Sequence, residues 1–233
     1  MNEVVKKIID NKPEYKKYID FLDGKYSNRF SKKIASEQND INALSLLSEI
    51  ELGYKLNQLF DDVKYEPNIN GKKPDWLVNS FEEKLIFEVR KINPLEQDVI
   101  DTLATFKDGK YFGNTKTSFS FSHSDFETTM GKIAQKEESY RSLITEYDYK
   151  LLVYFDVVML PDYCLTENDL QDLFEFENPK FPLNNYPFFM ENISGILAKP
   201  NFGNKIFIPN NKSKYLLKSE NKKKLELIGK ASI

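Results

Sequence analysis

The feature that most constrains the fold of this chain is the apolar run LLVYFDVVML at residues 151–160. A strand that is apolar on both faces is typical of a sheet interior, where helices cover both sides. The run therefore predicts a central strand in a layered α/β protein. Its one charged residue, Asp156, is unusual in such a strand, and we expect it either to neighbour a functional site or to cap a bulge.

Periodicity predicts the remaining elements. Apolar residues at helical spacing indicate helices, and short apolar runs bounded by turn residues indicate strands. A polar stretch leads up to Asn39, and the segments ISGILA and KIFIPN predict a hairpin before a lysine-rich tail. We expect helices at residues 3–22, 40–60, 94–106 and 125–145, and strands near residues 63–66, 76–78, 84–90 and 115–122. This order predicts a mixed central β-sheet flanked by helices.

The chain has 233 residues, which is long enough for one domain with a sizeable core. No linker rich in Pro, Gly and Ser divides it. We expect a single domain with a helical N-terminal extension over about residues 1–39, a core over about 40–160, and a hairpin and tail over about 161–233.

The amino-acid composition limits the kinds of disulfide and metal site that the chain can form. The single cysteine, Cys164, excludes an internal disulfide and a cysteine-based zinc site, and the single histidine, His123, excludes a multi-histidine metal site. Any metal must therefore bind through oxygen ligands, which favours Mg²⁺, Mn²⁺ or Ca²⁺. The formal net charge of −3 gives no overall basic signal for nucleic acid, although a local basic groove can form on an acidic protein.

The N-terminal sequence MNEVVKKIIDNKPEYKK lacks the uninterrupted apolar segment of a signal peptide. No other run approaches the length of a membrane span. We therefore expect a cytoplasmic protein without a membrane partner.

Two expected neighbouring strands each carry an acidic residue within GKKPDWLVNSFEEKLIFEVRK, residues 71–91. Asp75 lies at the start of the first strand and Glu88 near the end of the second, so pairing would bring both to one end of the sheet. Glu88 and Arg90 point to the same face of an extended strand. Two acids and a cation suit a divalent metal beside a phosphate. Alternatively, these are ordinary strand-end residues, because Pro-Asp also begins many turns.

The helix expected at residues 40–60 adds a third acid. Glu49 lies on the apolar stripe that includes Leu46 and Leu56, where a charge seldom occurs without a partner. It can also be a solvated rim residue or one favoured by the helix dipole. Glu51 is the alternative candidate on the same helix.

A helical Glu, a strand that begins with Pro-Asp and a strand that ends with Glu-x-basic together resemble the PD-(D/E)xK nuclease superfamily, which has the restriction-endonuclease-like fold. The resemblance runs through SEIELGYKLNQLFDDVKYEP, GKKPDWLV and KLIFEVRK, and more loosely through GKIAQKEESYRSL and LLVYFDV. It implies that Glu49 is the helical acid, Asp75 the motif aspartate and Glu88 the motif glutamate. These three would bind Mg²⁺ or Mn²⁺, and Arg90 would stand at the position of the motif lysine.

Arg90 departs from the family pattern. An arginine stays protonated and cannot act as a general base, but it can orient water or stabilise developing charge. Lys132 and Lys136, four residues apart on the next expected helix, are candidates to supply the missing ammonium group. Alternatively, both lysines belong to a solvated face together with Glu137 and Glu138.

The resemblance implies a metal-dependent nuclease that hydrolyses phosphodiester bonds of double-stranded DNA, as a restriction or defence endonuclease. A homodimer would fit, because cutting both strands usually uses two copies. One alternative is a nuclease-fold module that binds nucleic acid but has lost catalysis. Another is a structural or protein-interaction domain whose acids form salt bridges. The lysine- and tyrosine-containing segments 64–73 and 211–224 are either phosphate contacts or solvated surface.

Overall fold

The computed structural model describes residues 3–91, 123–156, 187–199 and 206–230. Within these ranges, strands form one six-stranded sheet in the order β1-β2-β3-β4-β5-β6. The strands are β1 (Asp62–Tyr65), β2 (Trp76–Ser80), β3 (Glu83–Lys91), β4 (Tyr149–Asp156), β5 (Ile193–Lys199) and β6 (Ile206–Pro209). The β3/β4 and β4/β5 pairs are parallel, and the other pairs are antiparallel. The predicted mixed sheet is confirmed.

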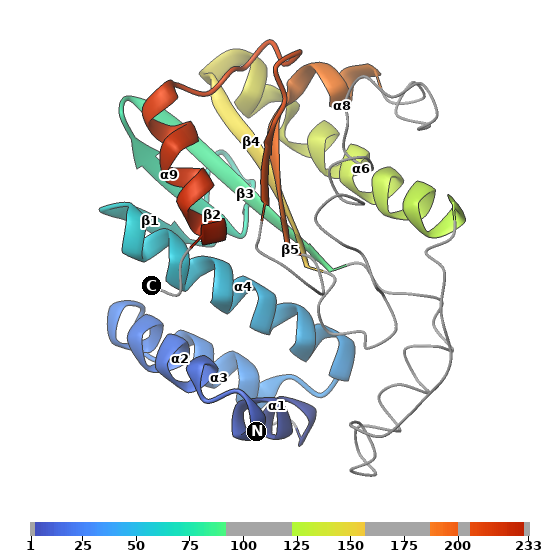
Figure 1. The fold of residues 1–233 in the computed structure, drawn as a ribbon. Coiled ribbons are helices and arrows are strands. Elements are labelled where there is room, and N and C mark those ends of the chain that lie inside the picture. Colours follow the sequence, from blue (N-terminus) through green and yellow to red (C-terminus); the bar gives the residue numbers. More distant parts are fainter. Residues whose placement is uncertain (1–2, 92–122, 157–186, 200–205, 231–233) are drawn as a thin grey trace.

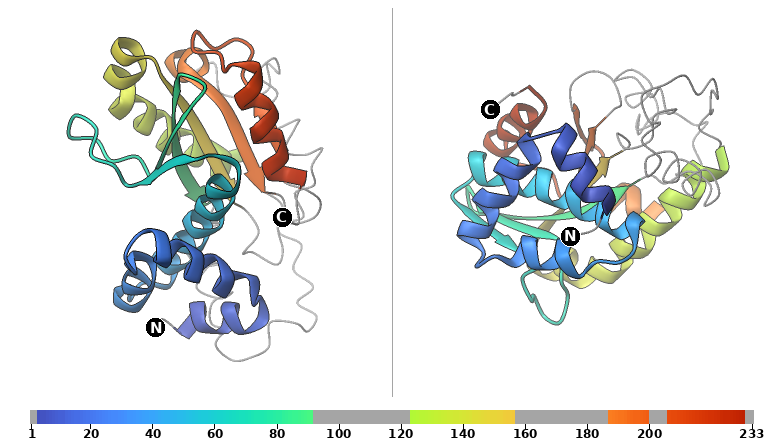
Figure 2. Two further views of the ribbon diagram at one scale, coloured as in Figure 1. Left: turned by 90° about the vertical axis from the view of Figure 1, so that its left-hand side faces the viewer. Right: turned by 90° about the horizontal axis from the view of Figure 1, so that it is seen from below.

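Helices lie on both faces of this sheet. They are α1 (Glu3–Asn11), α2 (Glu14–Lys25), α3 (Arg29–Ser36), α4 (Asp40–Leu59), α6 (His123–Tyr147), α8 (Pro187–Asn192) and α9 (Ser219–Lys230). Helices α4 and α9 cover one face, and α6 covers the other (Figure 1). The N-terminal helices α1, α2 and α3 pack against α4 (Figure 2), and Phe30 of α3 also contacts the ring of Tyr65 in β1. No helix of the described part of the chain is long and apolar enough to cross a membrane.

The sheet has a hydrophobic core on each face, because the side chains of its strands alternate between the two faces. Successive side chains of a strand point to opposite faces of the sheet, so β2 and β3 each contribute to both sides. The core on the α4 side includes Trp76, Val78, Leu85 and Phe87, and the core on the α6 side includes Leu77, Ile86, Tyr140 and Leu143. Every residue of β4 is buried, which confirms the predicted central strand for residues 151–156. Residues 157–160 of that prediction lie outside the described ranges.

The register of β2 and β3 determines where the acidic residues meet. Trp76 lies opposite Phe87 in this antiparallel pair. Asp75 precedes Trp76, so the same register extended by one residue places Asp75 opposite Glu88. Directly opposed residues of antiparallel strands project from the same face. The two carboxylates therefore share one end and one face of the β2–β3 ribbon.

Two predictions for the N-terminal region are wrong. The helix expected over residues 3–22 is interrupted, because α1 ends at Asn11 and α2 begins after Pro13. Proline lacks the N–H group that would continue the helical hydrogen bonding. The stretch expected to be merely polar contains α3, whose Phe30 and Ile34, four residues apart, are buried.

The helix predicted at residues 40–60 is confirmed as α4, and that predicted at residues 125–145 is confirmed within α6. The predicted C-terminal hairpin is confirmed by the antiparallel β5/β6 pair. The lysine-rich tail forms α9, a helix that periodicity had not indicated. The helix predicted at residues 94–106 and the strand predicted at residues 115–122 lie outside the described residues.

Candidate functional site

Asp75 immediately precedes β2 and is held by residues of two neighbouring segments. Its Oδ2 accepts a hydrogen bond of 2.7 Å from the backbone N–H of Val89 in β3. Its backbone carbonyl accepts a hydrogen bond of 3.0 Å from the N–H of Glu66, directly after β1. The following residue, Trp76, is fully buried and anchors the strand. The Asp75 carboxylate is therefore fixed at the end of the β2–β3 ribbon, although its side chain remains half-buried.

Glu88 lies one strand further into the sheet and is only 1% exposed. Its Oε2 accepts a hydrogen bond of 3.0 Å from Nη2 of Arg90, which confirms that these two side chains share a face of β3. Its Oε1 accepts a hydrogen bond from the hydroxyl of Tyr140 on α6. The Glu88 carboxylate is thus held by its own strand and by the helix that covers this face.

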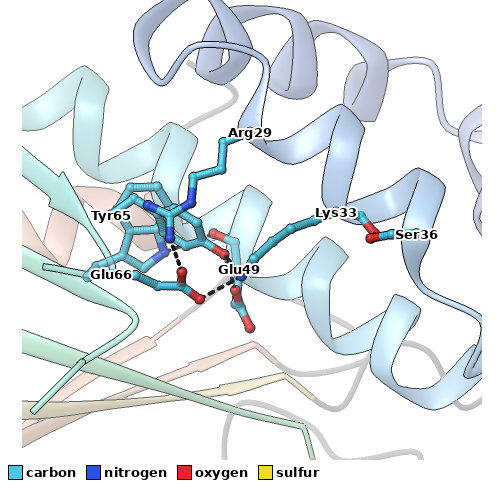
Figure 3. A network of polar contacts seen from close by, with 7 residues as sticks. Arg29, Lys33, Ser36, Glu49, Tyr65 and Glu66 are labelled. Atoms are coloured by element: carbon cyan, nitrogen blue, oxygen red, sulfur yellow. Dashed lines mark hydrogen bonds and ion pairs between the residues drawn. The ribbon is translucent and has the colours of Figure 1, made fainter.

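Glu49 reaches the same region from α4. Its Oε2 accepts a hydrogen bond of 2.8 Å from the Tyr65 hydroxyl, and that hydroxyl accepts one of 2.7 Å from Lys33 Nζ (Figure 3). The backbone carbonyl of Glu49 accepts a hydrogen bond of 3.1 Å from Trp76 Nε1. These contacts connect α4 directly to the strand that carries Asp75.

Glu51, the alternative helical acid, lies in a different cluster. It accepts a hydrogen bond of 3.0 Å from the hydroxyl of Tyr15 on α2 and an ion-paired hydrogen bond from Lys199 at the end of β5. Nearby, Ser48 donates a hydrogen bond of 2.8 Å to Asp156, which is fully buried in β4. Glu49 is instead the helical acid whose charge acts on the Asp75 carboxylate.

The three acids act on one another electrostatically. Burial raises the pKa of Asp75 well above its usual range, and the carboxylates of Glu88 and Glu49 raise it further. Burial also raises the pKa of Glu49, with additional contributions from Glu66 and Glu88, while Tyr65 and Lys33 act in the opposite direction. Like charges raise a carboxyl pKa in this way only when they lie close together in a poorly solvated place.

The donor atoms of this site suit a hard divalent cation. Asp75 lies opposite Glu88 when the β2/β3 register is extended by one residue beyond Trp76 and Phe87, and carboxylate oxygens are the preferred ligands of Mg²⁺ and Mn²⁺. In the described part of the chain, no group of three His, Cys, Asp or Glu side chains is arranged to hold a metal ion. Asp75 and Glu88 are thus the two carboxylates available for a cation at this end of the sheet, and Glu49 is the third acid that acts on them electrostatically.

Of the three cationic candidates, only Arg90 has a side chain within the described part of the structure. Arg90 is paired with Glu88, and its Nη1 donates a hydrogen bond of 2.9 Å to the carbonyl of Val89. Lys136 belongs to α6, as expected, but its side chain and that of Lys132 lie outside what is described.

Sequence reasoning missed the residues that support the acids. Tyr140 follows Lys136 by four residues on α6, so helical spacing from that candidate lysine could have indicated it. Tyr65 ends β1, and its alternation with Val63 indicates a buried position. Nothing in the sequence indicated Arg29 and Lys33, because the segment that contains them showed no helical stripe.

Comparison of the chain with protein-family models, with curated proteins and with solved structures gives no match. The similarity to the PD-(D/E)xK superfamily therefore stays a prediction that rests on Glu49, Asp75, Glu88 and the order of their elements.

Proposed function

We propose that this protein is a metal-dependent nuclease that hydrolyses phosphodiester bonds of DNA, with its acidic site at the end of the β2–β3 pair where β2 begins and β3 ends. The observation that carries the proposal is the register that sets Asp75 opposite Glu88, with Glu49 brought to the same place by α4. The pKa of Asp75, raised first by burial and further by the charges of Glu88 and Glu49, supports it, because a bound cation would offset both the burial of this charge and the repulsion.

Each residue has a distinct part in this proposal. Asp75 and Glu88 hold Mg²⁺ or Mn²⁺, and Glu49 is the third acid of the site. When bound, such an ion polarises the phosphate and lowers the pKa of a coordinated water. Arg90 keeps its proton, so it stabilises negative charge on the phosphate rather than acting as a base. Tyr140 positions Glu88 through its hydroxyl.

The substrate and the finer fold assignment come from the family resemblance. The order α4, β1-β2-β3, α6, β4 is compatible with a restriction-endonuclease-like core. We extend the proposal to double-stranded DNA cut by a restriction or defence enzyme, with two copies acting together.

Cleavage of plasmid DNA tests the proposal. We expect the unaltered protein to nick or linearise plasmid with Mg²⁺ or Mn²⁺, and EDTA to prevent it. Asp75→Asn and Glu88→Gln should each reduce the rate by about 100-fold or more, because each removes a charged ligand. Asp20→Asn, a matched change at an exposed position on α2, should cleave like the parent. Failure of the parent protein with both metals, or full activity of Asp75→Asn, would contradict the proposal.

One observation favours a second candidate, a module that binds nucleic acid without cleaving it. Arg90 places a permanent positive charge 3.0 Å from Glu88, where it can replace a metal ion as the neutralising group. In that case the unaltered protein would bind duplex DNA with a steep salt dependence and would cleave none. Absence of both cleavage and binding would indicate the structural alternative.

A further inference from the structure

Two cationic side chains of α3 project together toward the acidic site. Arg29 and Lys33 are one helical turn apart and therefore lie on the same face of the helix. Both donate to Glu66: Lys33 Nζ lies 2.6 Å from Oε1, and Arg29 Nη2 bonds to Oε2 (Figure 3). The side chain of Lys33 is 36% exposed and that of Arg29 is 44% exposed, so a molecule in solution can reach both.

Tyr65 connects this pair to the acids. Lys33 Nζ and Arg29 Cζ each lie 4.8 Å from the centroid of the Tyr65 ring, so the ring supports both cations. Lys33 also donates to the Tyr65 hydroxyl, which in turn donates to Glu49. A single hydroxyl group therefore separates the Lys33 ammonium from the helical acid of the candidate site.

Glu66 ties the pair to Asp75 as well. The backbone N–H of Glu66 donates a hydrogen bond of 3.0 Å to the carbonyl of Asp75. The residue whose carboxylate bridges the two cations is therefore hydrogen-bonded to Asp75. A phosphate group offers the same arrangement of anionic oxygens, and arginine and lysine bind phosphate through the same N–H groups that bind carboxylate. A phosphate group can therefore replace the Glu66 carboxylate as the partner of Arg29 and Lys33.

We propose that Arg29 and Lys33 form a phosphate-binding pair that contacts the DNA backbone beside the acidic site, and that Glu66 occupies this pair when no DNA is bound. The inference rests on the proposed nuclease function and adds to it a substrate contact from the N-terminal helices. Arg29 and Lys33 precede residues 44–92, which carry the family resemblance. The contact is therefore a property of this chain's own N-terminal extension.

Binding of a short fluorescein-labelled DNA duplex, followed by anisotropy in EDTA at several salt concentrations, tests the pair without cleavage. Each phosphate contact contributes about 0.9 to the slope of log affinity against log salt. Arg29→Gln and Lys33→Gln should each weaken binding and lower the slope by about one, and the double variant by about two. Lys32→Gln removes the same charge from an exposed position on the same helix and should leave the slope near that of the parent.

Glu66→Gln tests the proposal through an expected gain in DNA affinity rather than a loss. Removing the carboxylate that competes with phosphate should tighten binding, a gain that partial unfolding cannot produce. Glu82→Gln is the matched control, because Glu82 is an exposed carboxylate paired with Lys218 at 2.8 Å elsewhere on the surface. It should change the affinity much less. Thermal unfolding of each variant shows whether it is folded.

The outcomes separate this inference from the function on which it rests. If the parent protein binds DNA and the Arg29→Gln/Lys33→Gln variant binds it with the same affinity and salt dependence, the proposed phosphate contact is wrong while the nuclease proposal stands. Weaker or unchanged binding by Glu66→Gln would likewise contradict the exchange of carboxylate for phosphate. If the parent protein neither binds nor cleaves DNA, both proposals fail together.

Discussion

At the scale of single residues, each carboxylate of the candidate site is fixed by a different element. Asp75 is bonded to the backbone of β3, Glu88 to Tyr140 on α6, and Glu49 to Tyr65 on β1. Side chains held from three directions do not readily move apart to reduce their repulsion. Together with the burial of Asp75, which is the larger cause, this repulsion raises the pKa of its carboxyl group.

The stability of the Asp75→Asn variant tests whether the ionised Asp75 carboxylate is unfavourable in the folded protein. A carboxyl group whose pKa is higher in the folded than in the unfolded state costs stability as the pH rises through the folded-state pKa. The Asn variant keeps an oxygen that can accept the Val89 N–H but cannot ionise. We expect it to be more stable than the parent by about 1 kcal/mol at neutral pH in EDTA, and the difference to vanish in acid. Thermal unfolding across this pH range measures the effect; a less stable Asn variant at neutral pH would contradict it.

At the scale of elements, close packing between α4 and β2 determines where Glu49 lies. Gly53 faces the Trp76 ring so closely that a Cβ at this position would overlap it. One turn earlier on α4, the carbonyl of Glu49 accepts the bond from Trp76 Nε1. A helix without a side chain at position 53 can therefore approach the strand that carries Asp75.

Gly53→Ala should destabilise the protein by about 1–3 kcal/mol, because the buried indole ring has to move. Gly24→Ala on α2 is the matched control, since no atom lies within 4 Å of the added Cβ. That change should be neutral or stabilising by up to about 1 kcal/mol, because alanine favours the helix. Urea denaturation measures both changes. Equal effects of the two substitutions would show that the contact with Trp76 does not restrict position 53.

The sequence predicted some helices and strands better than others. Helix α4 and the strands β2 and β3 were predictable because their apolar residues repeat with the period of the element. Helix α3 was not, because its buried side chains are only Phe30 and Ile34, too few to form a recognisable stripe. Its stability comes from packing against α2 and α4, which no local pattern records.

At the scale of the whole molecule, a second polar cluster joins the N-terminal helix α2 and helix α4 to the end of β5. Glu51 on α4 bonds to Tyr15 on α2 and to Lys199 on β5. Burial lowers the pKa of Lys199, but Asp156 and Glu51 together leave it above the usual range, so this lysine is charged. The cluster fixes the helical layer that also carries Arg29 and Lys33.

Lys199→Met should destabilise the protein by about 3 kcal/mol, because it leaves buried carboxylates without their cation. Adding Glu51→Gln should restore part of the loss. Lys214→Met removes an exposed lysine that pairs with Glu191 at 2.5 Å and should cost less than about 1 kcal/mol. Thermal unfolding compares the three variants, and a cost for Lys199→Met no greater than for Lys214→Met would contradict a structural role for the cluster.

The candidate site was predictable only in its local part. Asp75 and Glu88 follow from two strands that are consecutive in sequence, and Glu49 follows from a charge on an apolar helical face. The contacts of Lys33 with Tyr65 and of Tyr140 with Glu88 join residues far apart in sequence. Such contacts depend on how helices pack on the sheet, and spacing along the chain does not contain that information.

Titration calorimetry with Mn²⁺ tests the central claim, that Asp75 and Glu88 together bind a divalent cation, most directly. We predict saturable binding to the parent protein and to Asp20→Asn at neutral pH, and loss of that binding in Asp75→Asn and in Glu88→Gln. Unchanged Mn²⁺ binding by either of the last two variants, or no binding by the parent protein, would contradict the account.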